Sequence, residues 1–257
     1  MIAETFEMKV EGSQPGARLD LYRMEYSQNI GVDLRPLLLM CPGGGYNYTS
    51  DRESDPLAVH FLSAGYHVAI LRYSCNPAVF PTALLELAEA MKLIHAHAGE
   101  WHVDTDKIVV QGCSAGGHLA ASLGVFWHEK WLAEKAATTN DVLRPAGMLL
   151  CYPVITSGKY AHRGSFESLL RGQYTEEMLE RTSLEKQVSE YTPKAFIWHT
   201  YTDKSVPVQN SLLLIEAMKE YEIPVEFHMY PVGDHGLATC DKWSLTSFRK
   251  NVRAGFH

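Results

Sequence analysis

The amino-acid sequence predicts an α/β protein whose central sheet is mostly parallel, with helices on both faces. Six continuous apolar runs of strand length alternate with segments of helical periodicity. Continuous apolar runs are typical of strands that are buried on both faces, as in parallel sheets. Alternation of strands and helices predicts right-handed crossovers between parallel strands. Because the 257 residues are 46% hydrophobic and show no break in composition, we expect a single domain over residues 1–257.

Eight stretches of the chain are expected to form strands. Two early stretches have strand-like sequences and are expected to add an antiparallel edge to the sheet. The six apolar runs that follow are expected to supply the parallel strands. The early stretches are 2–10 and 18–26, and the apolar runs are 36–41, 66–72, 107–111, 147–152, 195–200 and 225–230.

Helices are predicted between these strands by apolar periodicity and by their end signals. In the segment 82–98, apolar residues recur at spacings of three and four and form one face. Gly99 is expected to end that helix, since glycine often follows the last helical turn. The segments 56–64 and 208–221 are predicted to be helical in the same way.

One connection departs from this alternation. The segment 153–193 separates two predicted strands and is too long for a simple loop. Within it, Thr175 followed by Glu176 and Glu177 is typical of a capped helix start. We expect this segment to form a small helical cap near the functional site. A surface excursion that leads away from the site is the alternative.

Composition and charge exclude several classes of function. The net charge is −7 and no stripe of lysine or arginine is present, which argues against a nucleic-acid partner. No stretch approaches the roughly 20 apolar residues of a membrane span, and the segment 1–16 lacks the features of a secretory signal. Five cysteines without CxxC spacing indicate neither a disulfide framework nor a zinc site. We therefore expect a cytoplasmic protein.

The sequence GCSAG at 112–116 is the sharpest chemical signal. It follows the apolar run 107–111 directly and precedes a helix-forming stretch, and GxSxG in that context is typical of a nucleophile turn. The turn is so sharp that its flanking positions favour glycine. It also holds the serine at a helix N-terminus, where developing negative charge is favoured. We predict that Ser114 is a nucleophile, and a glycine-rich turn without chemistry is the alternative.

Three glycines follow an earlier strand, in the sequence PGGGY at 42–46. Consecutive glycines let the backbone pass close to a ligand and direct N–H groups toward it, as an oxyanion hole requires. We expect the N–H groups of Gly44, Gly45 and Ala115 to bind an oxyanion, and Tyr46 to contact the substrate. A phosphate-binding loop is disfavoured, because neither GxxxxGK[ST] nor GxGxxG with a later acidic residue is present. A plain flexible loop is the remaining alternative.

A histidine and an aspartate complete the predicted chemistry. His235 lies in a glycine-flanked loop just past the last predicted strand, where ligand sites of open α/β sheets lie. Asp203 follows the preceding strand. The order serine, aspartate, histidine is the one expected with GxSxG and differs from the trypsin-like and subtilisin-like orders. We predict that His235 is the base and that Asp203 is the acid that orients it, with Asp234 and Asp241 as competing acids.

Five blocks of the chain resemble those of a known family. In order they are PGGGY, SDRE at 50–53, GCSAGGHLAASL, TDKSVP and GDHGL. On these blocks the chain resembles the α/β-hydrolase fold serine esterases of the acetyl esterase and acetylxylan-esterase-like group. Pro42 stands where related lipases and esterases often have histidine. Dienelactone-hydrolase-like relatives have cysteine at the nucleophile position, which is Ser114 in this chain.

The resemblance and these residues together imply two-step acyl transfer through an acyl-enzyme, with no metal and no cofactor. The expected partner is a small-molecule ester with a short acyl group, acetyl first, on a sugar or another polar alcohol. The segment 153–193 has no surplus of large apolar residues and carries Arg163 and Arg171, so a long apolar tunnel is not expected. A peptidase or amidase, a lactone hydrolase and a non-catalytic homologue on the same fold are the alternatives. The sequence leaves open a homo-oligomer.

Overall fold

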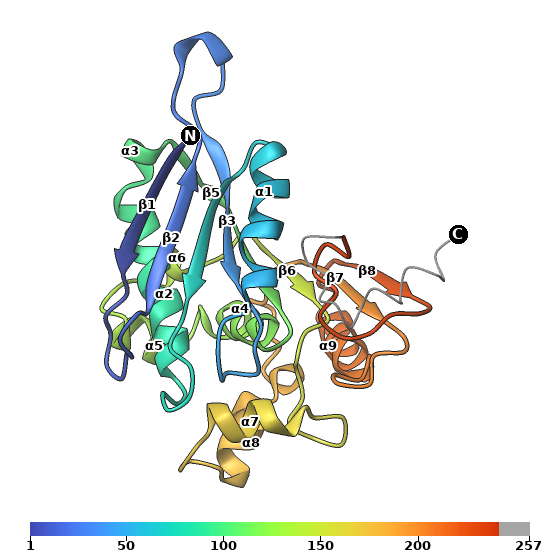
Figure 1. Ribbon diagram of the computed structural model, residues 1–257. Coiled ribbons are helices and arrows are strands. Elements are labelled where there is room, and N and C mark those ends of the chain that lie inside the picture. The colour runs from blue at the N-terminus through green and yellow to red at the C-terminus, as the bar shows by residue number, and fades with distance from the viewer. Residues whose placement is uncertain (242–257) are drawn as a thin grey trace.

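The computed structural model describes residues 1–241 of the chain (Figure 1). Within these residues one sheet contains the strands β1 (Ile2–Glu7), β2 (Arg18–Arg23), β3 (Arg35–Cys41), β4 (His67–Arg72), β5 (Val103–Cys113), β6 (Gly147–Cys151), β7 (Ala195–Thr200) and β8 (Val225–Tyr230). Their order is β1-β2-β4-β3-β5-β6-β7-β8. β2 is antiparallel to both β1 and β4, and the other neighbours are parallel. The expected parallel sheet with an antiparallel edge is confirmed.

Helices cover both faces of this sheet. They are α1 (Asp55–Ser63), α2 (Thr82–Ala96), α3 (Ala98–Trp101), α4 (Ala115–Phe126), α5 (Lys130–Lys135), α6 (Asn140–Leu143), α7 (Arg163–Leu169), α8 (Glu176–Thr182) and α9 (Gln209–Glu220). Successive residues of β3 point to opposite faces. Leu37 and Leu39 belong to a large core with α2, α4 and α9, whereas Leu38 and Met40 pack with α1. None of the helices within residues 1–241 is long and apolar enough to cross a bilayer.

The carboxyl ends of the central strands lie at one edge of the sheet. Cys41 at the end of β3 is in register with Gly112 of β5, and Cys113 is in register with Cys151 at the end of β6. The loops that follow these three strands therefore leave the sheet side by side. This is the edge at which open α/β sheets bind ligands.

One helix end differs from the expectation. Helix α2 ends at Ala96, and Gly99 lies inside the short helix α3 instead of ending α2. The left-handed residue that ends α3 is His102, with φ 55°. A second helical turn, α3, begins directly after His97. The left-handed residue that ends the helical segment, His102, therefore lies three positions after Gly99.

The segment 153–193 connects β6 to β7 and contains α7, α8 and the 3₁₀ turn η3 (Leu184–Lys186). Figure 1 shows α7 and α8 beyond the ends of β3 and β5, on the side toward which these strands point. The Thr175 hydroxyl accepts a hydrogen bond from the Met178 N–H at 3.2 Å, so the predicted cap residue begins α8.

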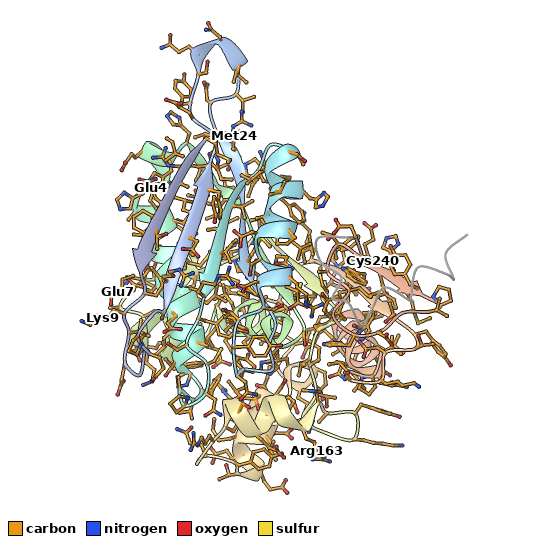
Figure 2. All side chains as sticks on the ribbon, viewed as in Figure 1. Glu4, Glu7, Lys9, Met24, Arg163 and Cys240 are labelled. Atoms are coloured by element: carbon orange, nitrogen blue, oxygen red, sulfur yellow. The ribbon has the colours of Figure 1, made fainter. Side chains whose placement is uncertain are left out.

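The two arginines of this segment have different surroundings. Arg163 is exposed and lies at the outer edge of the molecule, where α7 begins (Figure 2). Arg171 donates to Asn76 Oδ1 at 2.9 Å, and Asn76 in turn donates to Asn47 Oδ1 at 3.3 Å. Arg171 therefore links the segment to the glycine loop, whereas Arg163 faces solvent.

Candidate active site

The turn that carries Ser114 is as sharp as the sequence predicts. Ser114 lies between β5 and α4 with φ 55° and ψ −120°, a conformation that L-residues rarely adopt. A Cβ atom on Gly116 would lie 2.0 Å from the Cys41 carbonyl oxygen, and one on Gly112 would lie 2.1 Å from the Gly116 oxygen. Both flanking positions therefore have room only for glycine.

Two consecutive hydrogen bonds connect the Ser114, His235 and Asp203 side chains. Ser114 Oγ lies 2.7 Å from His235 Nε2, and His235 Nδ1 lies 2.6 Å from Asp203 Oδ2. A carboxylate can only accept, so Nδ1 donates to Asp203 and Nε2 is left to accept from the serine hydroxyl. The structure thus brings together the three residues that were predicted from separate parts of the sequence.

The Asp203 carboxylate is buried, and both of its oxygens have polar partners. Its Oδ1 accepts from the Ser205 and Val206 N–H groups, each at 2.9 Å, and His199 Nε2 lies 3.4 Å from Oδ2. Burial raises the pKa of Asp203, but hydrogen bonds from His199, His235 and Val206 outweigh it and hold the pKa well below its usual value. The group is therefore a stable anion beside the His235 ring.

The two competing acids have surroundings different from those of Asp203. Asp234 is exposed, although it precedes His235 in the chain. Asp241 Oδ2 lies 3.7 Å from His60 Nε2. Of the three candidates, the structure therefore pairs Asp203 with His235.

The glycine loop lies directly against Ser114. A Cβ atom on Gly43 would lie 3.0 Å from the Ser114 Cβ atom. Gly44 and Gly45 have φ values of 136° and 65°, which glycine adopts readily. Within residues 1–241, the N–H groups of Gly44, Gly45 and Ala115 donate no hydrogen bond. They are therefore left without an acceptor among these residues.

The expectation for Tyr46 needs correction. Its side chain is only 3% exposed, and its hydroxyl lies 2.8 Å from His118 Nδ1. His118 Nε2 in turn donates to the Thr182 carbonyl at 2.8 Å, so Nδ1 accepts from Tyr46. Tyr46 therefore packs inside the protein instead of facing a substrate. The exposed aromatic side chain of this loop is Tyr48, which is 61% exposed and lies against Gly44.

The buried His118 ring is expected to make the stability of the protein depend on pH. Burial lowers the pKa of His118 from 6.5 to about 4, although the hydrogen bond to Thr182 opposes this. The unfolded chain therefore binds a proton below pH 6.5 that the folded chain does not bind until about pH 4. Stability should fall by up to about 3 kcal/mol as the pH falls through this window.

We expect His118→Gln to lose this part of the pH dependence, because an amide can accept from Tyr46 and donate to Thr182 without titrating. Urea unfolding at pH 7 and at pH 4.5 measures the effect. His228→Gln, which changes an exposed histidine, is the control. An unchanged pH dependence in His118→Gln would show that this histidine does not titrate as its burial implies.

Three residues of the site were not assigned from the sequence. Glu53 and Tyr152 hold the glycine loop and the histidine loop, and His199 contacts Asp203. Glu53 ends the SDRE block, but a short polar block does not indicate that one of its side chains is buried. His199 lies one residue before the end of a predicted strand, at the functional edge of the sheet, which was the available signal.

A family model described as BD-FAE matches residues 19–218, which include Ser114 and Asp203. The chain belongs to the BD-FAE family. Among curated relatives of this BD-FAE chain, Endo-1,4-beta-xylanase B of Butyrivibrio fibrisolvens is 35% identical over 234 residues, 86% of this chain and 36% of that protein. Acetylxylan esterase of Xylanibacter ruminicola is 26% identical over 203 residues, 76% of this chain and 39% of that protein. The chain thus spans less than two-fifths of either relative.

Solved structures share the fold of the BD-FAE chain. The acetyl ester-xyloside bifunctional hydrolase from Caldicellulosiruptor lactoaceticus has a TM-score of 0.79 at 33% identity, covering 88% of this chain and 82% of that one. The carboxylesterase Cest-2923 from Lactobacillus plantarum has a TM-score of 0.81 at 27% identity, covering 96% and 89%. The α/β-hydrolase fold and the resemblance to acetylxylan-esterase-like proteins are confirmed. These likenesses support the expected enzyme class, a carboxylic ester hydrolase.

Proposed function

We propose that the chain is a serine carboxylesterase that acts through Ser114, His235 and Asp203. Hydrogen bonds run without interruption from the Ser114 hydroxyl to the buried Asp203 carboxylate, and they support this function most directly. The three groups stand at the carboxyl ends of parallel strands, where such folds bind ligands. Curated and solved relatives that are named esterases agree with it.

The chemistry proceeds in two steps. Ser114 Oγ attacks the ester carbonyl carbon while His235 Nε2 takes its proton, and the alcohol leaves with a proton from the same nitrogen. Water then attacks the acyl-enzyme and gives a proton to His235. As the bond between the acyl carbon and Ser114 Oγ breaks and the acid leaves, His235 returns that proton to Ser114 Oγ. Asp203 keeps the proton of the neutral ring on Nδ1 and stabilises the imidazolium that forms.

The negative charge that develops on the carbonyl oxygen requires donors near Ser114. The N–H groups of Gly44, Gly45 and Ala115 are our candidates. Gly44 and Gly45 belong to the loop that lies against Ser114, and Ala115 begins α4, whose N-terminus favours negative charge. No metal ion or cofactor is required for these steps.

We propose a short acyl group, acetyl first, because residues bonded to Ser114 and Asp203 belong to a compact buried cluster. The Val154 N–H donates to the Ser114 carbonyl, and the Val206 N–H donates to Asp203. Both side chains are fully buried in one cluster with Phe166. A long acyl chain needs a continuous apolar channel, since each buried CH₂ contributes about 0.8 kcal/mol. We propose that this cluster leaves no room for such a channel.

We propose a sugar or another polar alcohol for the leaving group. Exposed Tyr48 offers a ring beside Gly44. Burial lowers the pKa of His162, and the charge of His235 lowers it further. His162 Nδ1 lies 2.9 Å from Ser165 Oγ. This Ser165 Oγ atom lies 3.8 Å from the empty Cβ position of Gly45, in the glycine loop. An exposed aromatic ring such as that of Tyr48 suits a polar alcohol, and two relatives are named for acetylxylan or acetyl ester-xyloside substrates.

The test is kcat/KM for p-nitrophenyl esters with acyl chains of two to twelve carbons, followed by acetylated xylo-oligosaccharides. We expect the value to be highest for acetate and to fall steadily with chain length, because longer chains meet the buried cluster. A maximum at eight carbons or longer would make the enzyme lipase-like. Hydrolysis of simple acetates without any action on acetylated sugars would remove the carbohydrate part of the proposal.

We also propose that the enzyme works in a reducing compartment, the cytoplasm. The five cysteines are all free. Cys41, Cys113 and Cys151 are buried in the protein, where cysteine packs as a small apolar residue. A chain folded under reducing conditions therefore loses no cross-link that this structure requires.

A further inference from the structure

Three loops of the site meet at the Glu53 carboxyl group. Glu53 ends the 3₁₀ turn η2 (Asp51–Glu53) and is only 3% exposed. Its Oε2 accepts from the Gly43 N–H at 2.9 Å, and its Oε1 accepts from the Tyr152 hydroxyl at 2.8 Å. The Tyr152 oxygen accepts from the Ala238 N–H at 3.0 Å. Glu53 thus connects the glycine loop, the end of β6 and the loop of His235.

The same turn fixes both peptide groups that flank Gly43. Glu53 holds the Gly43 N–H, and the Ser50 N–H donates to the Gly43 carbonyl at 2.8 Å. In a planar trans peptide the carbonyl and the following N–H point in opposite directions. The Gly44 N–H is therefore held pointing away from Ser50. The direction of this proposed oxyanion donor is set by the turn at 50–53.

Glu53 also lies very close to the nucleophile. The empty Cβ position of Gly43 is 2.5 Å from Glu53 Oε2 and 3.0 Å from the Ser114 Cβ atom. On the other side, the Tyr152 ring packs edge-on against the His235 ring, with 5.0 Å between centroids. The carboxyl group and its tyrosine partner therefore contact the loops on both sides of the serine.

Hydrogen bonding explains how a carboxyl group is tolerated here. Burying one is unfavourable unless its oxygens are satisfied, and Glu53 forms no salt bridge among residues 1–241. Both oxygens are instead satisfied by groups of the site loops. A change at Glu53 should therefore displace those loops before it disturbs the core of the sheet.

We propose that Glu53 is a positioning residue of the reaction, which aligns the Gly44 N–H with the oxyanion and fixes the distance between the glycine and histidine loops. This inference rests on the proposed esterase function. Glu53 does not touch the substrate. It acts through Gly43 on the charge that develops in the transition state, so its loss lowers kcat and leaves substrate binding nearly unchanged.

Three variants test this role. Glu53→Ala removes both acceptors, and Tyr152→Phe removes only the connection to the histidine loop. Glu53→Gln keeps one carbonyl oxygen, which can still accept from the Gly43 N–H. Glu86→Gln is the matched control, because Glu86 is also fully buried and accepts from the Ser74 N–H and hydroxyl and from the Ser13 hydroxyl, none of which belongs to the site loops.

With p-nitrophenyl acetate we expect Glu53→Ala to lose about 10²-fold in kcat, the scale of losing an oxyanion donor. Glu53→Gln and Tyr152→Phe should each lose roughly tenfold, and KM should stay within about threefold of wild type. The inhibition constant of ethylboronic acid, which forms a tetrahedral adduct on serine, should weaken in parallel with kcat. Glu86→Gln should lower the melting temperature and leave kcat unchanged.

The outcomes separate the inference from the function on which it rests. If the wild-type protein hydrolyses no ester, the proposed function fails. If wild type is active and the folded Glu53 variants keep kcat within twofold, the positioning role is overturned while the function stands. Equal losses in Glu53→Gln and Glu86→Gln would reduce Glu53 to a structural residue. Should Glu53→Ala not fold, Glu53→Gln and Tyr152→Phe decide the question by the same measurements.

Discussion

Replacing Ser114 by alanine is expected to lower ester turnover by at least about 10⁴-fold, the scale of removing a nucleophile from such a triad. The hydroxyl oxygen lies 2.7 Å from His235 Nε2 and is the group that attacks the ester. The fold should survive, because the turn is held by backbone bonds from the Ser114 N–H to Cys151 and from the Val154 N–H to Ser114. Alanine and serine share the same strain at φ 55°.

Cys113→Ala is the matched control for this variant. Cys113 precedes the nucleophile but lies fully buried in a cluster with Cys151 and Tyr152. Burial raises the pKa of its thiol well above the usual value, so it is a poor nucleophile. We expect Cys113→Ala to keep most of the turnover and of the labelling by a fluorophosphonate. Labelling of Ser114→Ala in the same peptide, or turnover close to wild type, would remove Ser114 from its proposed role.

The sheet was predictable because its central strands are buried on both faces. β3 and β4 read as unbroken apolar runs, and the structure places them beside one another with helices on both faces. The nucleophile turn was also predictable, because its flanking positions exclude every side chain. The glycines of GCSAG occupy positions where a Cβ would fall about 2 Å from a backbone oxygen, so the local sequence alone specifies the turn.

Side-chain direction within a loop was not predictable. Tyr46 and Tyr48 stand two residues apart after the same three glycines, yet one is buried and the other exposed. The difference follows from the left-handed conformation of Tyr46, with φ 58°, which turns its ring toward His118. Nothing in the alternation of residue types indicates which tyrosine takes that conformation.

Contacts between polar groups far apart in the chain were also not predictable from the sequence. Glu53 meets Tyr152 across 99 positions of the chain, and Tyr152 meets Ala238 across another 86. A buried carboxylate cannot be told from a solvated one by its neighbours in the sequence, because burial depends on how the loops converge. Asp203 and His235 were predicted because each follows a strand at the functional edge of the sheet, where the loops after the strands form the ligand site.

Asp203→Asn is expected to lower turnover by about 10⁴-fold, because it reverses the tautomer of His235. Asp203 Oδ1 accepts from two backbone N–H groups, those of Ser205 and Val206. The amide of asparagine must present its oxygen to these donors, since its NH₂ group would only oppose them. The NH₂ group then faces His235 Nδ1, which must accept, and the ring proton moves to Nε2. A protonated Nε2 cannot take the proton of Ser114.

Asp234→Asn is the matched variant and should keep turnover within about twofold. Asp234 is exposed beside His235 in the chain, so its substitution removes a similar negative charge from the same loop without changing the hydrogen bond at Nδ1. The measurement is kcat/KM for p-nitrophenyl acetate in both variants, with circular dichroism to establish that each is folded. If Asp234→Asn loses the greater share of turnover, the acid belongs to the histidine loop, and Asp203 only holds its own loop through Ser205 and Val206.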